Sequence, residues 1–338
     1  MKPRRQGDRK ARRVLLVENL PPSETVWWLK YVPKSTSTEV VVARVDDRSP
    51  WRSILPLIRI WWNLGRYDAV ITHQDGMATF VLGALNALWT RSACRHIVNE
   101  FITTERRPGL YSTLKYRFLR FALSKVSVVI CSSKGELDYY QRSLGLRRGA
   151  LRFIPFATNP EFAGTAIAAS DRFVLSAGRT GRDYATLLRA VDGLPLRVVV
   201  VAGHSSMEGL QVPRSVEVLL DIPMLRLHEL VRRAVAVVVP LNDQPISIGQ
   251  SVIVHAMAVG TPVIATRVNA TVDYITDGVN GILVPPHDVD RMRAAIMDLW
   301  VDEELASKLG RSGALVAREH FLINKKIATI CGLLRRPL

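Results

Sequence analysis

Residues 246–266 read ISIGQSVIVHAMAVGTPVIAT and place an apolar helical run directly before a short β-branched segment. The run SVIVHAMAV is apolar around its whole circumference, so a helix over it must be buried on all sides. Gly260 is suited to end that helix, because glycine readily adopts the left-handed backbone of helix C-termini. TPVIAT predicts the strand that follows. A buried helix followed at once by an apolar strand is typical of parallel α/β sheets.

The alternation of apolar strand and helical segment recurs along the chain. In the first half the predicted strands are Arg13–Val17, Glu39–Val45, Asp68–Thr72, His96–Val98 and Val126–Cys131. In the second half they are Phe173–Ala177, Arg197–Ala202, Val216–Leu220, Val235–Pro240, Thr261–Thr266 and Gly281–Val284. Because both halves show the pattern, the sequence predicts an α/β protein with two Rossmann-like, doubly wound parallel-sheet domains.

The length of 338 residues fits two domains, and a hydrophobic content of 48% supplies two cores. The segment FATNPEFAGTAIAASDR (residues 156–172) lacks a helical or strand-like apolar pattern and is rich in Pro, Gly, Ala and Ser, as expected of an interdomain linker. We expect a basic disordered arm over residues 1–12, a first domain over 13–160 and a second over 161–320. Residues 321–338 are expected to form a helix that crosses back to the first domain.

The net charge of +16 is concentrated in the first half, where residues 1–150 hold 26 Lys and Arg against 12 Asp and Glu. Such a field attracts nucleic acid, anionic lipid or a phosphorylated substrate. An arginine-rich composition from a GC-rich genome is the alternative explanation. A nucleic-acid-binding protein is the hypothesis that we rank last, because no recognition motif accompanies the charge.

The three cysteines lie far apart, and neither they nor the histidines show ligand spacing, so we expect no disulfide framework and no metal site. No apolar run approaches the roughly 18 residues that span a bilayer. The apolar part of the N-terminal segment is too short for a signal peptide. The expected location is the cytoplasm.

Phosphate-loop, nucleophile-elbow, HExxH and first-strand GxGxxG motifs are absent.

The turn after the strand Phe173–Ala177 is the first candidate site. It contains Gly178, Arg179, Gly181 and Arg182 and leads into the helical segment DYATLLRAV. Glycines allow close approach to a phosphate, the helix N-terminus offers free N–H groups, and arginines suit phosphate oxygens. A solvated turn with two surface arginines is the alternative interpretation.

The start of the predicted helix before Gly260 is the second candidate. Gly249 and Gln250 precede SVIVHAMAV, and Ser247 and Ser251 are suited to capping or to ligand hydrogen bonds. His255 lies among apolar neighbours within this helix. Taken alone, a histidine in such surroundings is more often a hydrogen-bonded core residue than a ligand.

Polar residues also follow two strands of the first half. Asn99 and Glu100 come after His96–Val98, and His73, Gln74 and Asp75 come after Asp68–Thr72. In open parallel sheets, ligands bind beyond the carboxyl ends of the strands, where these residues are expected. Capping of the following loop is the alternative role.

The second half resembles the C-terminal domain of family 4 glycosyltransferases. The resemblance is carried by AMAVGTPVIAT, by VDYITDGVNGILVPPHD (residues 272–288), by the following DRMRAAIMDLW and by FVLSAGRTGRDYATLLRA. It covers roughly residues 173–321; before that only the strand pattern and VVICSSKGELDYY (residues 128–140) agree. The family has the GT-B architecture, two Rossmann-like domains facing across a cleft, and its members are retaining enzymes.

The resemblance implies sugar transfer from a nucleotide diphosphate sugar, with no cofactor and no metal. Arg179 matches the family arginine that neutralises the diphosphate, and Arg182 is the candidate substitute for a family lysine that is missing here. Asn99 or Glu100 occupies about the place of a family histidine that faces the donor sugar. The resemblance assigns the donor pocket to the C-terminal domain, where we expect Gly178, Ser247, Gly249, Gln250, Ser251, Val252 and His255 to line it.

Two family glutamates that hold the donor sugar and the ribose are replaced here by Ser247 and His255. One branch of the family carries a Gly-Gln pair where Gly249 and Gln250 stand, which suggests a remodelled pocket in which His255 contacts the ribose. The replacements also support a rival hypothesis, a non-catalytic relative that serves as a binding or partner protein. A nucleotide-sugar epimerase on the same architecture is a further alternative.

The resemblance implies that the first domain binds the acceptor, which in many relatives is lipid-linked. The segment ERRPGLYSTLKYRFLRFALSK (residues 105–125) could rest on an anionic membrane surface at the inner face of the cell membrane. Its basic residues Lys115, Arg117, Arg120 and Lys125 scatter around a helix instead of forming one stripe. An ordinary packed helix with solvated arginines is the alternative. No nucleic-acid partner is expected, and the acceptor's identity is left open.

Overall fold

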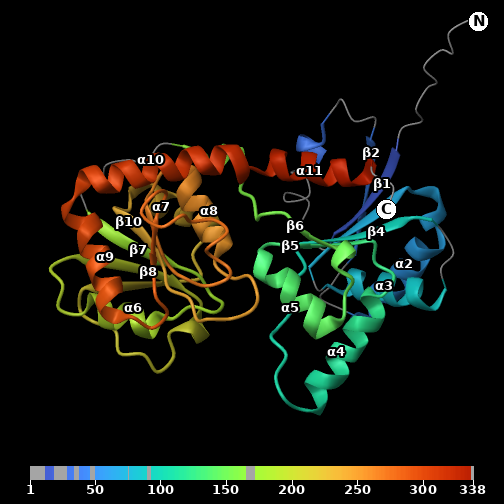
Figure 1. Ribbon diagram of the computed structural model, residues 1–338, viewed down its shortest axis with the longest axis horizontal. Helices are drawn as coiled ribbons and strands as arrows, with labels where there is room; N and C mark the ends of the chain where they lie inside the picture. Colours follow the sequence, from blue (N-terminus) through green and yellow to red (C-terminus); the bar gives the residue numbers. More distant parts are fainter. Residues whose placement is uncertain are drawn as a thin grey trace, which may run out of the picture. The chain divides into compact units, whose positions relative to one another are not determined.

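The computed structural model describes residues 12–18, 29–33, 38–45, 50–74, 76–89, 93–164 and 172–335 (Figure 1). The chain divides into two compact units, of which the first comprises residues 1–131, 137–154 and 327–338 and the second residues 132–136 and 155–326. These divisions lie a few residues from the predicted boundaries at 160 and 320. The expected arm lies outside the described residues, except for Arg12, which begins the first strand.

The first unit contains a parallel sheet with the strand order β2-β1-β3-β4-β5-β6. Its strands are β1 (Arg12–Glu18), β2 (Thr38–Arg44), β3 (Ala69–His73), β4 (Arg95–Asn99), β5 (Val128–Cys131) and β6 (Leu151–Phe153). The helices between them are α2 (Pro50–Trp62), α3 (Met77–Leu88), α4 (Leu110–Leu123) and α5 (Lys134–Leu144), with the 3-10 turns η1 (Leu64–Arg66) and η2 (Arg148–Ala150).

Helices α2 to α5 bury apolar side chains of this sheet. Leu57 of α2 and Leu82 of α3 pack with β1 and β3. Tyr116 of α4 and Tyr140 of α5 pack with β4 and β5. The end of helix α11 (Ile323–Arg335) also belongs to this unit, and Arg95 at the start of β4 donates a hydrogen bond of 2.9 Å to one of its carbonyl oxygens.

The second unit contains a parallel sheet with the order β12-β11-β10-β7-β8-β9. Its strands are β7 (Phe173–Ala177), β8 (Arg197–Ala202), β9 (Val216–Leu220), β10 (Ala236–Val239), β11 (Val263–Thr266) and β12 (Ile282–Val284). Its helices are η3 (Pro160–Phe162), α6 (Tyr184–Val191), η4 (His204–Ser206), α7 (Met224–Arg233), α8 (Gln250–Val259), α9 (Val289–Val301) and α10 (Glu303–His320).

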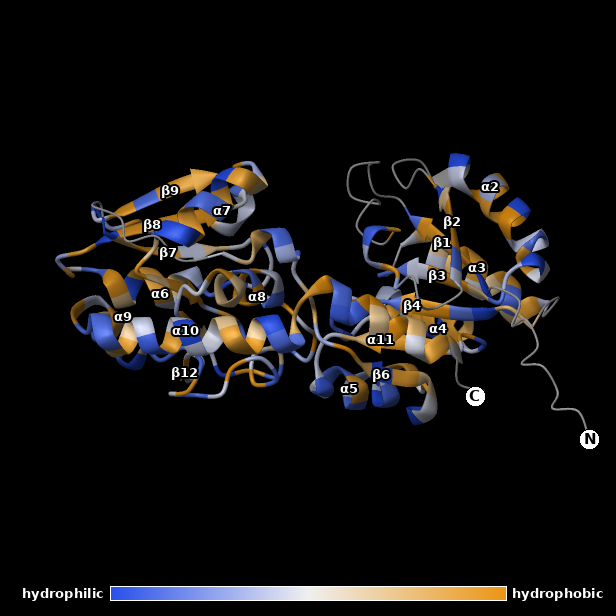
Figure 2. Cartoon of the chain, turned by 90° about the horizontal axis from the view of Figure 1, so that it is seen from above, coloured by the Kyte–Doolittle hydropathy of each residue, from blue (hydrophilic) through white to orange (hydrophobic). Residues whose placement is uncertain are grey.

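Helices α6 and α9 share one core with the strands of the second sheet, and the predicted helix α8 is buried as expected. It ends at Gly260, whose φ of +93° is the left-handed conformation predicted for it. Gly310 of α10 lies so close that a Cβ atom there would be 2.1 Å from the Gly260 carbonyl oxygen. Hydrophobic and hydrophilic residues alternate along α10, as expected of a helix with one buried side (Figure 2).

All the strands predicted from sequence are present within a few residues of their predicted bounds, and the predicted fold class is confirmed. Strand β6 is an addition. It has three residues with Arg152 in the middle, so it lacks the apolar run on which the other predictions rest. Because the strands of each sheet are parallel, their carboxyl ends lie along one edge of that sheet.

Candidate functional site

Two loops meet at the carboxyl edge of the second sheet, after β7 and after β10, which are neighbouring strands. The amide N–H of Asn242 donates to the Gly181 carbonyl oxygen at 3.1 Å, and the amide of Asp183 donates to the Pro240 carbonyl oxygen at 3.1 Å. Each loop therefore supports the other, and the loops lead into helix α6 after β7 and helix α8 after β10. Helix N-termini of this kind can bind anions.

The turn after β7 requires its two glycines. Gly178 has φ +138° and Gly181 has φ +64°. A Cβ atom at Gly178 would lie 2.1 Å from the Arg182 guanidinium, and one at Gly181 would lie 2.2 Å from the Ile248 side chain. Both the backbone conformation and the close neighbours therefore exclude larger residues.

Arg182 folds back onto this turn. Its Nε donates to the Ala177 carbonyl oxygen at 2.9 Å, and its Nη1 donates to the Thr180 carbonyl oxygen at 3.0 Å. Burial lowers the pKa of its guanidinium below the ordinary value. With two nitrogen atoms engaged in this way, Arg182 supports the turn from within, and its predicted role at a diphosphate stays a prediction.

Arg179 extends from the same turn into solvent, with 67% of its side chain exposed. Its Nη2 lies 2.9 Å from Asp221 Oδ1, directly after β9. His204 Nε2 lies 3.5 Å from the other carboxylate oxygen of Asp221. An exposed ion pair of this kind contributes little stability, so the Arg179 guanidinium can exchange Asp221 for another anion at small cost.

Helix α8 begins at Gly249, whose φ of +89° places it in the left-handed region, and no side chain caps its N-terminus. Ser247 and Ser251, two candidate caps, lie elsewhere: Ser247 is buried in the loop and Ser251 is exposed on the helix. Gln250 is buried and donates from Nε2 to the Ala270 carbonyl oxygen at 3.4 Å. The first turn of α8 thus keeps the partial positive charge of its N–H groups for an anion.

Glu136 holds the loop that precedes α8, and it is not among the predicted site residues. Its fully buried carboxylate accepts the amide N–H of Ser247 at 2.8 Å through Oε1. Its Oε2 accepts the amides of Ser132 and Ser133 at 2.9 and 3.1 Å. Burial raises the pKa of Glu136, while these hydrogen bonds oppose the shift. The S-x-x-E spacing of Ser133 and Glu136 is a capping box, the one sequence signal that could have identified this residue.

His255 is buried in a group of three rings. Its Nε2 lies 2.8 Å from His228 Nδ1 on α7, so one ring donates and the other accepts. Phe162 of η3 stacks on its ring, with centroids 5.2 Å apart. Burial, assisted by His228, lowers the pKa of His255 to about 4. These contacts are those of a hydrogen-bonded core histidine, and the predicted ribose contact stays a prediction.

The low pKa of His255 predicts a loss of stability in acid. Unfolded histidine titrates near 6.5, so between about 6.5 and 4 the unfolded chain binds more protons than the folded one. The free energy of unfolding should therefore fall as the pH is lowered through this range, by up to roughly 3 kcal/mol. Thermal melting from pH 7 to pH 4 should show a shallower decline for His255→Gln than for the exposed control His204→Gln. Parallel curves for the two variants contradict the prediction.

Asp183 and His287 form a further polar pair at this edge, also absent from the predicted set. Asp183 is the N-cap of α6 and accepts the amide and hydroxyl of Thr186 at 3.1 and 2.6 Å. His287 Nδ1 lies 2.8 Å from Asp183 Oδ2, and 63% of its side chain is exposed. The pair fixes the start of α6 and places an accessible imidazole beside it.

Glu100 lies in the first unit, after β4, with a left-handed φ of +52°. Beside it, Asn99 is buried and its Nδ2 lies 3.1 Å from His73 Nδ1. His73 Nε2 in turn lies 3.5 Å from the buried carboxylate of Glu18. The polar residues predicted after β3 and β4 thus gather at the carboxyl edge of the first sheet; Asp75 lies outside the described residues.

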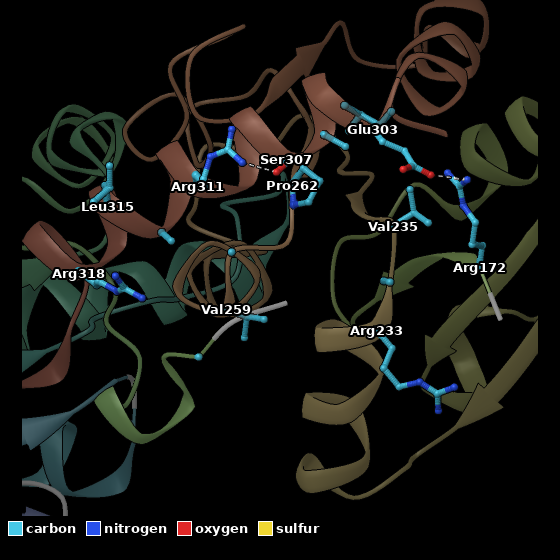
Figure 3. Close-up of a pocket in the computed structure, with 16 residues that line it drawn as sticks. Arg172, Arg233, Val235, Val259, Pro262, Glu303, Ser307, Arg311, Leu315 and Arg318 are labelled. Carbon is cyan, nitrogen blue, oxygen red and sulfur yellow. Dashed lines mark hydrogen bonds and ion pairs between the residues drawn. The ribbon is translucent and has the colours of Figure 1, made fainter. Parts of the chain in front are cut away.

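A large cavity of about 670 Å³ lies at the opposite, amino edge of the second sheet (Figure 3). Residues directly before β7, β10 and β11, namely Arg172, Val235 and Pro262, line it together with α10. Arg172 pairs at 2.9 Å with Glu303, which also lines this cavity. It contains none of the predicted site residues. Within the described ranges, the structure shows no cluster of three or more His, Cys, Asp or Glu suited to a metal ion.

Residues 158–316 match the family Glycosyl transferases group 1, which places every second-unit residue predicted for the site within the matched segment. The similarity to the group 1 glycosyltransferases is confined to this segment, which is slightly less than half of the chain. Glu136 lies outside it, although it packs in the same unit.

Curated relatives of the group 1 segment include D-inositol 3-phosphate glycosyltransferases. The protein from Saccharomonospora viridis is 36% identical over 153 residues, which are 41% of this chain and 34% of the relative. That from Mycobacterium marinum is 38% identical over 143 residues, or 39% and 29% of the two chains. The chain therefore matches only about a third of the length of these relatives.

Solved structures share the whole fold at low identity. Sucrose-phosphate synthase from Thermosynechococcus elongatus superposes with a TM-score of 0.73 at 18% identity, covering 96% of this chain and 98% of that one. The Anabaena protein Alr3699/HepE, solved with UDP and glucose, gives 0.71 at 16% identity, covering 96% and 99%. The fold is thus the GT-B fold of glycosyltransferases.

Proposed function

We propose that the chain is a glycosyltransferase that moves a sugar from a nucleotide diphosphate sugar to an acceptor. The observation that carries the proposal is the match of residues 158–316 to the group 1 family. This segment includes the uncapped start of α8 and the glycine-containing turn before α6, both at the carboxyl edge of the second sheet. Arg179 and the N-terminus of α8 supply positive charge suited to a leaving diphosphate. We propose that this charge serves in place of a metal ion and that the reaction retains the anomeric configuration.

The donor proposal is tested with a panel of nucleotide sugars. UDP-glucose is the first probe, because the similar Alr3699/HepE protein was solved with it. Isothermal titration calorimetry with the full chain should give saturable binding for at least one donor, and donor hydrolysis or transfer should follow. Binding without any turnover favours the rival non-catalytic role, and conversion of the donor into an epimer favours an epimerase.

We propose further that the acceptor is lipid-linked and that the protein works on an anionic membrane surface at the inner face of the cell membrane. Helix α4 supports this proposal with a row of exposed large apolar side chains, Leu110, Tyr111, Leu114, Phe118 and Phe121, which are 40 to 82% exposed. At roughly 100° per residue they lie within an arc of about 100° on one side of the helix. Such a row, next to basic residues, is suited to the lipid interface. No described helix is long and apolar enough to cross a membrane.

The row on α4 predicts vesicle binding that depends on its apolar side chains. Leu114→Gln combined with Phe118→Gln should reduce binding to vesicles of phosphatidylcholine and phosphatidylglycerol at least tenfold, since each buried apolar side chain contributes about 1.5–3 kcal/mol. Flotation of the full chain measures this. The matched control is Leu55→Gln on α2, which is also exposed, at 68%. An equal loss in the control assigns binding to general hydrophobicity and contradicts the prediction.

A further inference from the structure

A cavity of about 560 Å³ on the first unit is lined by three arginines, Arg106, Arg117 and Arg120. Arg117 and Arg120 come from α4, and Arg106 comes from the segment that precedes it. The hydroxyl-bearing residues Thr113 and Ser143 also line the cavity. Guanidinium and hydroxyl groups together form the donor set that proteins use for phosphate.

The charge of these arginines is not neutralised by neighbours. In the part of the chain that the structure describes, no carboxylate lies within ion-pair distance of any of the three. Arg106 lies over the Tyr116 ring, 5.7 Å from its centroid, which leaves its N–H groups available. Residues 105–125 hold one acidic residue, Glu105, against six basic ones. Three uncompensated guanidinium groups around one cavity favour an anionic occupant.

The cavity also contains a hydrogen-bonding group without a partner. Ser143 Oγ is buried and forms no hydrogen bond within the described residues. Arg120, by contrast, is anchored, because its Nε donates to the Leu144 carbonyl oxygen at 3.1 Å. An anchored arginine beside an unsatisfied hydroxyl is a preorganised place for a ligand oxygen.

The cavity adjoins the exposed apolar row of α4. Phe121 belongs to both, since it lines the cavity and is 40% exposed. At roughly 100° per residue, Arg117 lies about 20° from Leu110 at the border of the row. A ligand with its anionic group in the cavity therefore has apolar protein surface directly beside it.

We propose that this cavity binds the phosphate of an anionic membrane lipid, whose acyl chains lie along the apolar row of α4. The inference rests on the proposed membrane function and assigns it a headgroup site. The phosphate oxygens accept from Arg106, Arg117, Arg120 and Ser143, and the acyl chains cover Leu114, Phe118 and Phe121. A freely soluble phosphate would leave that row exposed, so the combination of charge and apolar surface favours the lipid.

The test compares Arg117→Gln with the matched control Arg52→Gln, a surface arginine on α2 of the same unit. Flotation of the full chain is measured with two kinds of phosphatidylcholine vesicle. One contains phosphatidic acid, and the other contains enough oleate to give the same surface charge without a phosphate group. Arg117→Gln should weaken binding to phosphatidic acid about tenfold or more and Arg52→Gln by no more than about fivefold, the effect of one charge near the surface. The oleate vesicles should show no difference between the two variants.

Two results overturn the proposal. Equal losses for both variants on phosphatidic acid assign binding to general electrostatics. Binding of glycerol 3-phosphate as tight as vesicle binding, with the same dependence on Arg117, assigns the cavity to a soluble phosphate. Nucleotide-sugar binding measured on the same samples keeps the two hypotheses separate. Arg117-dependent lipid binding in a chain that binds no donor refutes the proposed transferase and leaves the headgroup site standing.

Discussion

Replacing Arg179 with alanine is expected to lower donor turnover by about 100-fold or more while the chain stays folded. An electrostatic contact to charge that develops in the transition state is worth a factor of this size. The structural loss is small, because the side chain is 67% exposed and its ion pair with Asp221 is a surface pair. Turnover numbers and KM for the donor, together with melting temperatures, measure both effects.

Arg197→Ala is the matched control for this experiment. Arg197 is also an exposed arginine with a carboxylate partner, Glu217, but it begins β8 and so lies at the amino edge of the same sheet. Its loss should leave donor turnover within about twofold of the unmodified chain, as expected of a surface pair. Equal donor turnover in the two variants contradicts the assignment of Arg179 to the donor site.

Replacing Glu136 with alanine is expected to destabilise the second unit by about 3 kcal/mol or more and to weaken donor binding. The substitution leaves the amides of Ser132, Ser133 and Ser247 in a buried place without their acceptor, and each unsatisfied group costs about 1–3 kcal/mol. Release of Ser247 should also loosen the loop that leads to the start of α8. Urea unfolding and calorimetry with the donor identified by the panel measure the two effects.

Glu217→Ala removes an exposed carboxylate from the same unit and serves as the comparison for Glu136. Its effect on the free energy of unfolding should stay within about 1 kcal/mol, because Glu217 pairs at the surface. If the Glu136 variant is destabilised but binds donor with unchanged affinity, Glu136 supports the fold alone and does not position the donor loop.

The fold was predictable because its signals are local and repeated. An apolar run such as Arg197–Ala202 can be buried on both faces only in a covered parallel sheet, and the chain repeats that run with a helix after it. The buried helix α8 and its glycine terminus at Gly260 were predictable for the same reason. Strand β6 was not predictable in this way, because its three residues, which include Arg152, are too few to show an apolar pattern.

The candidate site was only partly predictable. The glycines of the turn after β7 and the helix start at Gly249 follow from the sequence, because only particular residues tolerate those backbone conformations. The direction of a long side chain does not follow. Arg179 and Arg182 stand three residues apart in one turn, yet the first reaches Asp221 in solvent and the second bonds carbonyl oxygens of its own loop.

The sequence by itself determined the two parallel sheets, their order along the chain and the loops that border the carboxyl edges, since these depend on local apolar pattern and backbone preference. Only the tertiary structure decided which distant groups meet: Glu136 with Ser247, His255 with His228, and the row of apolar side chains on α4 with a cavity of three arginines. Such contacts join residues far apart in sequence, and their existence depends on the packing of whole elements, which no local pattern encodes.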